Sequence, residues 1–181
     1  MTINIRQETN EDVHKVYEVV KAAFAQGEHS DQDEHNLVNR LRKSPNFIPE
    51  LSLVAEEHGK ILGHILFTEI KVGEHMLIAL APVAVLPDTQ GKGIGKKLIT
   101  EGHRIATNLG YKGSVVLGHA EYYPKFGYEK ASMYQIKAPF DVPDENFMAM
   151  ELQDQGLSGV QGVVEYAKSF FEKKTKFINN M

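Results

Sequence analysis

The chain has 181 residues, enough for one domain with a substantial buried core. Its formal net charge of −4 and pI near 6.1 give no basic surface of the kind that general nucleic-acid binding needs. No apolar run approaches the ~18 residues of a membrane span, and the first residues lack the apolar core of a signal peptide. We therefore expect a cytoplasmic protein without a nucleic-acid or membrane partner.

Cysteine is absent, which excludes disulfides, thiolate metal sites and a cysteine nucleophile. Any acyl transfer must therefore go directly to the acceptor or use a less common nucleophile. Histidines and carboxylates do alternate between His29 and His35, but no H-x-x-x-H pair exists in the chain. We expect no metal site.

The N-terminal third predicts one strand and two helices. Residues 3–6 alternate between apolar and polar, as in a short half-buried strand. A capping-box pattern then introduces apolar positions with helical spacing over 13–24. Ser30 and Asp33 repeat the capping pattern, so we expect a second helix that ends before Pro45.

From residue 51 the apolar period changes from helical to alternating. Turn signals separate the segments 51–55, 61–72 and 76–86, which predicts a meander of three antiparallel strands. The last segment is almost wholly apolar, so we place it at the centre of the sheet. Pro82 lies within it and lacks a ladder donor, which indicates a bulge or a local opening of the sheet.

A glycine-rich turn over 90–97 leads from this strand into a helix that ends near Gly110. Glycines let a backbone approach a phosphate, and the first N–H groups of the helix point towards it. The spacing fits neither the P-loop nor the dinucleotide fingerprint, but Gln90, Gly93 and Gly95 satisfy Q/R-x-x-G-x-G/A. The alternative is a turn that only packs the helix on the strand. The helix positions expected to face the core are Ile94, Leu98, Ile105 and Leu109.

The last third alternates short elements. We expect a strand over 114–117, a turn or short helix over 122–128, and strands near 134–138 and 147–152. Residues 163–171 fit either a terminal helix or an added strand. Apolar side chains in this tail would cover a cleft of the domain or form a dimer contact, and the sequence does not choose between these roles: Val160, Val163, Val164, Phe170 and Phe171.

Three motifs taken together resemble the GNAT superfamily of acetyl-CoA-dependent N-acetyltransferases. The segment 83–85 matches the family's L-x-V strand end, 90–96 its pyrophosphate loop and 123–128 its Y-x-x-F-G-F block. The resemblance implies a mixed α/β (α+β) fold whose mostly antiparallel, twisted central sheet is flanked by helices and splayed at the cofactor strand. We expect residues 1–152 to form the N-acetyltransferase domain and 153–181 a C-terminal extension packed on it.

The resemblance implies that acetyl-CoA binds along these motifs as a cosubstrate. Its diphosphate would lie on the loop's backbone N–H groups, with positive charge from Lys92 and Lys96 nearby. Its pantetheine arm would run beside the strand end, where an N–H of Val83 or Val85 would bond the thioester oxygen. The implied cofactor contacts are Val83, Ala84, Val85, Gln90, Gly91, Lys92, Gly93, Ile94, Gly95 and Lys96.

Tyr123 corresponds to the family's general acid, which protonates the departing CoA thiolate. A phenol is protonated at neutral pH, so this role is chemically sound; the alternative is that Tyr123 only packs. Tyr122 is a less favoured substitute. Many family members carry Asn where this chain has Val116, so a cofactor contact is absent or its space is filled by Gly118 and His119.

The sequence does not single out a general base, and a water relay can serve in this family. The candidates are Glu28, Glu34, Glu69, His119 and Glu121. Four acidic residues between positions 28 and 34 are consistent with steering a cationic acceptor, although we favour a solvated helix start.

We therefore predict an enzyme that transfers the acetyl group of acetyl-CoA to a primary amine of an unidentified acceptor. Direct attack in a ternary complex is favoured because the chain has no cysteine to carry the acyl group. The protein would be a monomer or a homodimer. The alternatives are a non-catalytic acyl-CoA sensor and an interaction domain with a degenerate loop.

Overall fold

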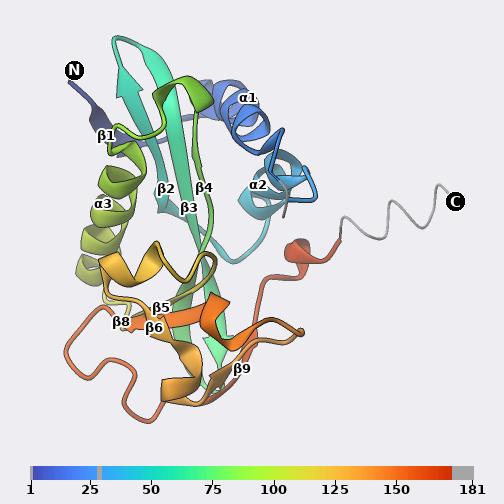
Figure 1. Cartoon of the computed structure of the whole chain (residues 1–181), viewed down its shortest axis with the longest axis vertical. Coiled ribbons are helices and arrows are strands. Elements are labelled where there is room, and N and C mark those ends of the chain that lie inside the picture. Colours follow the sequence, from blue (N-terminus) through green and yellow to red (C-terminus); the bar gives the residue numbers. More distant parts are fainter. Residues whose placement is uncertain (1, 28–29, 173–181) are drawn as a thin grey trace, which may run out of the picture.

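The computed structural model describes residues 2–27 and 30–172. Within these residues a twisted sheet separates two helical layers (Figure 1). The helices are α1 (Val13–Phe24), α2 (Glu34–Arg42) and α3 (Ile94–Asn108). The strands are β1 (Asn4–Gln7), β2 (Phe47–Glu57), β3 (Lys60–Val72), β4 (His75–Val85), β5 (Gly113–Leu117), β6 (Glu129–Lys130), β7 (Ile136–Lys137), β8 (Phe147–Glu151) and β9 (Gly162–Glu165).

The sheet is mostly antiparallel, with the strand order β1-β2-β3-β4-β5-β8-β6. Among the described strands, β4–β5 and β7–β9 are the parallel pairs. The mixed α/β fold and the central place of the third meander strand, β4, are thereby confirmed. None of the helices within 2–27 and 30–172 has the length and apolar character needed to span a bilayer.

The sheet splays at the end of β4. That strand pairs with β5 only through Ile78, Ala79 and Leu80, but it continues beside β3 as far as Val85. The register with β3 shifts between the pairs Ile65–Val83 and Phe67–Leu80, so two residues of β4, one of them Pro82, oppose one of β3. The bulge and the opening predicted from this proline are both confirmed.

Helix α3 packs on one face of the sheet, where Ile94, Leu98 and Ile99 join the largest buried cluster. Gly102 lets the helix lie directly on Phe67, whose ring would overlap any Cβ at that position. Helices α1 and α2 pack on the opposite face through a separate cluster (Figure 1). The two faces of the sheet are therefore buried by different helices.

Two expectations of the sequence analysis are wrong at helix ends. Leu109 is the C-cap residue of α3 and is 43% exposed, because the chain turns away from the sheet at Gly110. Ser30 does not cap α2; the N-cap is Asp33, and the Ser30 hydroxyl bonds the Gln32 N–H and the Glu34 carboxylate instead.

Of the two alternatives for residues 163–171, the structure shows an added strand and no terminal α-helix. Strand β9 pairs antiparallel with β3 through Lys71–Glu165 and Val72–Val164, and parallel with β7. One helical turn, η6 (Lys168–Phe170), follows it. The segment after residue 152 thus returns to the sheet on the side where α2 packs (Figure 1).

Candidate active site

The glycine-rich loop leads into the N-terminus of α3 and is open at two of its glycines. Gly91 and Gly93 both have φ of +81°, and Gly93 is the N-cap residue of the helix. A Cβ at either glycine would meet no atom within 4 Å. Since Lys97 donates the first backbone hydrogen bond to Gly93, at 3.1 Å, the preceding N–H groups of the helix face outwards. This arrangement fits an anionic group such as a diphosphate.

The end of β4 presents an unpaired backbone edge beside this loop. The Leu86 N–H bonds the Leu62 carbonyl on β3 at 2.9 Å. Because successive N–H groups along a strand alternate in direction, those of Val83 and Val85 point away from β3, towards the splay. Gln90 holds the loop to this edge by donating from Nε2 to the Val85 carbonyl at 3.1 Å.

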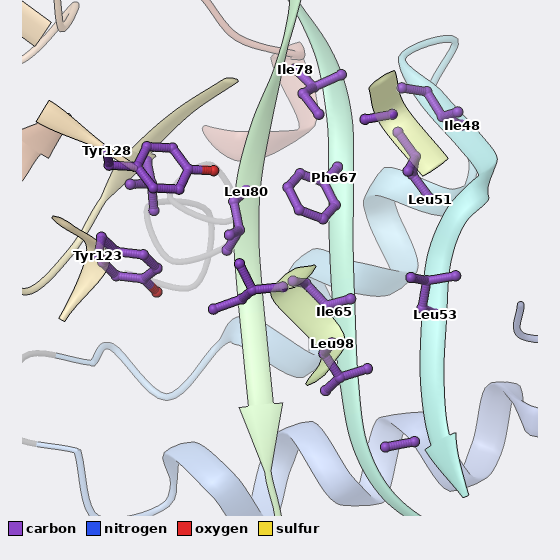
Figure 2. Packing of buried hydrophobic residues seen from close by; sticks show 14 of the residues in the cluster. Ile48, Leu51, Leu53, Ile65, Phe67, Ile78, Leu80, Leu98, Tyr123 and Tyr128 are labelled. Carbon is purple, nitrogen blue, oxygen red and sulfur yellow. The ribbon is translucent and has the colours of Figure 1, made fainter. Parts of the chain in front are cut away.

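Tyr123 lies on the short helix η3 (Tyr123–Phe126), on the open side of β4. In Figure 2 the hydroxyl end of its ring points towards that strand. The ring fits against Gly118, where any Cβ would overlap it. Burial raises the pKa of the Tyr123 phenol, so the group keeps its proton at neutral pH. No hydrogen bond to this hydroxyl occurs within the described part of the chain.

Tyr128 packs edge-on against the Tyr123 ring, with centroids 5.9 Å apart. Its own hydroxyl is buried between Ser114 Oγ, at 2.8 Å, and His103 Nε2, at 2.9 Å. Tyr128 is therefore fixed by β5 and α3 together, and it supports the orientation of Tyr123. The sequence analysis did not identify this network, because its members lie on three separate elements.

Tyr122 contacts the start of α3. Its hydroxyl lies 3.0 Å from the point where a Cβ of Gly95 would be, so the glycine makes room for the phenol. Burial raises the pKa of Tyr122 as well. The adjacent tyrosines thus take different places: Tyr122 borders the loop, while Tyr123 is enclosed by Gly118 and Tyr128.

The candidate general bases are scattered. Glu69 accepts a hydrogen bond from the Tyr111 hydroxyl at 2.7 Å and lies on the α3 face of β3. His119 and Glu121 line a shallow depression beside Tyr122, together with Asn146. Glu34 is bonded by the Ser30 hydroxyl, and Glu28 lies outside the described residues. The arrangement favours none of them as a single base.

Val116 and the acidic segment can be placed as well. Val116 is buried in β5. Two residues further on, Gly118 exchanges hydrogen bonds with Asn146. The side chain of Asn146 therefore lies close to Val116, the position at which many family members carry an Asn. Asp33 forms an ion pair with Arg40 at 3.2 Å, which partly neutralises the acidic segment. Within 2–27 and 30–172, no three potential metal ligands lie together.

Comparisons with known proteins agree with this geometry. A family model described as an acetyltransferase (GNAT) domain matches residues 49–130. The uncharacterized N-acetyltransferase YjhQ of Escherichia coli K12 is 36% identical over 140 residues, which are 75% of this chain and 75% of YjhQ. The uncharacterized N-acetyltransferase YhbS of the same strain is 33% identical over 140 residues, 76% of this chain and 83% of YhbS.

Two solved structures extend the likeness over nearly the whole chain. The crystal structure of Escherichia coli YhbS in complex with CoA has a TM-score of 0.85 at 28% identity and covers 93% of this chain and 91% of that one. A GNAT family acetyltransferase from Brucella melitensis in complex with acetyl-CoA has a TM-score of 0.78 at 34% identity, with coverage of 93% and 98%.

The chain therefore belongs to the GNAT family of N-acetyltransferases. This membership confirms the predicted family, the fold class and the enzyme class, an acetyl-CoA-dependent N-acetyltransferase.

Proposed function

We propose that this enzyme transfers the acetyl group of acetyl-CoA to a primary amine by direct attack in a ternary complex. The observation that carries the proposal is the unpaired edge of β4 leading into the open glycine loop at the N-terminus of α3. The relatives solved with CoA and with acetyl-CoA support it. The proposed contacts are Val83, Ala84, Val85, Gln90, Gly91, Lys92, Gly93, Ile94, Gly95 and Lys96.

When bound, acetyl-CoA supplies an activated acetyl thioester. The outward N–H of Val83 or Val85 would donate to the thioester oxygen and stabilise the negative charge that develops on it. As the bond between the amine nitrogen and the acetyl carbon forms and the C–S bond breaks, Tyr123 would donate a proton to the thiolate. The nitrogen would release one proton to water, and the Tyr123 phenolate would regain its proton from water. The phenol is neutral at physiological pH, so it carries the proton that this role requires.

We also propose that residues 1–152 form the catalytic domain and 153–181 an extension packed on it. The pairing of β9 with β3 supports this division, because the extension adds a strand to a sheet whose main path is already complete.

The test is isothermal titration with acetyl-CoA of three proteins: the parent, Gly93→Glu and Gly110→Glu. Both glycines have positive φ and open surroundings, but Gly110 lies at the opposite end of α3, so it controls for backbone strain and added charge. We expect the parent and Gly110→Glu to bind acetyl-CoA with micromolar Kd. In Gly93→Glu the affinity should fall at least about 100-fold, because a carboxylate would stand where the diphosphate binds.

An absence of binding by the parent would refute the proposal. Cofactor binding without thiol release against any amine would instead favour a non-catalytic acyl-CoA sensor.

A further inference from the structure

A cavity of about 410 Å³ lies where β4 and β5 part. Its sheet side consists of residues 79–81 and 115–117, which include the last paired residues, Leu80 and Val116. Ala81 is the first residue of β4 beyond that pair and also lines the cavity. The cavity therefore adjoins the unpaired edge on which the proposed thioester site lies.

In the part of the chain that the structure describes, the opposite wall is aromatic and uncharged. It consists of Phe140, Tyr166, Phe170 and Phe171. The Tyr166 ring lies nearly parallel to Phe140, with centroids 6.1 Å apart, and edge-on to Phe170, at 5.0 Å. Among the described residues of the lining, Tyr166 is the one with an ionisable side chain, and burial raises its pKa, so these residues are neutral at physiological pH.

Contacts on both sides hold this wall in place. Strand β9 is paired with β3 up to Glu165, the residue before Tyr166. On the far side, Arg40 of α2 donates from Nε to the Ser169 carbonyl at 3.2 Å. Phe140 and Phe171 remain 38% and 51% exposed, so the cavity has an entrance while its inner wall is fixed.

We propose that this cavity binds the apolar group of the acceptor, and that the preferred acceptors are primary amines carrying an aromatic or branched aliphatic group on a short linker. The inference rests on the proposed function. A volume of about 410 Å³ is far larger than an acetyl group needs and is in the range of small-molecule sites. Flat apolar groups pack well on aromatic rings.

The neutral lining also disfavours other acceptor classes. A polyamine or a lysine side chain entering the cavity would lose its hydration without meeting a counter-charge. The same desolvation lowers the pKa of an ammonium group and so favours the neutral amine, which is the attacking form.

The experiment compares phenethylamine, ethylamine and spermidine as acceptors, with thiol release as the readout. The parent is measured beside Phe140→Ala and Phe171→Ala, which truncate exposed rings of the wall, and beside Met133→Ala, an exposed control outside the cavity. We expect phenethylamine to have the highest kcat/KM. Each wall variant should raise the KM for phenethylamine about tenfold, while its KM values for acetyl-CoA and ethylamine stay within about twofold of the parent's. Met133→Ala should leave all three KM values unchanged.

A second readout does not depend on turnover. N-acetylphenethylamine is titrated into each protein saturated with CoA, and we expect about a tenfold weaker affinity in the wall variants only. If no amine releases thiol, the proposed transferase function fails, and this titration alone decides the cavity proposal.

Three results would overturn the inference. One is equal use of phenethylamine and ethylamine; another is a preference for spermidine. The third is a Phe140→Ala variant that changes the ranking of acetyl-CoA against longer acyl-CoAs but not the ranking of amines, since the cavity would then hold the acyl chain.

Discussion

Two regions of this enzyme differ in how the sequence assembles them: the loop side, residues 83–96, and the cavity side, the residues that line the cavity between β4 and β5. The proposed cofactor contacts come from one stretch, residues 83–96, and most of them are backbone groups. The cavity is assembled from β4, β5, Phe140 and the segment 166–171, which lie far apart in the sequence. If both proposals hold, cofactor binding depends on local backbone geometry, whereas acceptor choice depends on side chains brought together by long-range pairing.

The largest expected effect concerns the one side chain with a proposed chemical role. Tyr123→Phe should lower kcat about 100-fold, or ~3 kcal/mol, because the thiolate loses its proton donor. KM for acetyl-CoA should stay within about twofold, as measured by steady-state thiol release. Tyr122→Phe is the matched control and should change kcat less than about threefold. An equal fall in both variants would remove the distinction between the two tyrosines.

Acid should lower the free energy of unfolding through one buried histidine on each face of the sheet. Burial lowers the pKa of His103, on α3, and of His64, beside Glu8 and Arg42 on the opposite face of the sheet, to about 4 each. The unfolded chain binds these protons near pH 6.5 and the folded chain does not, so stability is lost as pH falls from 6.5 towards 4. We expect about 2 kcal/mol from each histidine between pH 7 and 4.5.

Urea unfolding at several pH values measures this dependence. His64→Gln and His103→Gln should each flatten the curve between pH 6.5 and 4.5. His14→Gln, at an exposed position of α1, should leave its slope unchanged. Parallel curves for all four proteins would contradict the assignment.

Tyr128→Phe removes the hydroxyl that bridges Ser114 and His103 behind Tyr123. Two buried polar groups lose a partner, so the free energy of unfolding should fall by about 1–2 kcal/mol. Tyr134→Phe, which removes an exposed hydrogen bond to Glu129, should cost less than about 0.5 kcal/mol. An equal fall in the free energy of unfolding of both variants, measured by denaturant titration, would show that the buried bridge stabilises the fold no more than the exposed hydrogen bond does.

The smallest expected effect concerns the hydrogen bond by which Arg40 of α2 holds the cavity wall. Arg40→Lys removes the Nε donor to the Ser169 carbonyl and should raise acceptor KM about threefold, with KM for acetyl-CoA unchanged. Arg104→Lys, which alters an exposed ion pair with Glu101 on α3, should change neither constant. A change in acetyl-CoA KM with Arg40→Lys would mean that the two regions are coupled.

The sequence predicted the backbone conformation of residues 82–96 because its signals are local, whereas the cofactor contacts of these residues stay a prediction. Positive φ at Gly91 and Gly93 requires glycine, and Pro82 disrupts the ladder wherever it lies in a strand. For residues 163–171, which contribute most of the aromatic cavity wall, the sequence does not decide between a helix and a strand. The position of this wall depends on β9 pairing with β3 about ninety residues earlier, and no local pattern specifies such a partner.

The same limit explains two further omissions. The contact of Tyr122 with Gly95 and the bridge at Tyr128 join elements whose adjacency only the folded chain reveals. Periodicity also placed Leu109 in the core, because helical spacing continues past the residue at which the chain leaves the sheet.

The position of the glycine-rich loop depends on Gly102, which is not among the proposed cofactor contacts. The helix rests on Phe67 at this glycine, so the absence of one methyl group sets how deeply α3 sits on the sheet. Gly102 lies eight residues after Ile94, or about 12 Å along the helix axis. A substitution that raised the helix there would tilt its first turn away from the edge of β4 and misalign the two parts of the proposed cofactor site without altering either.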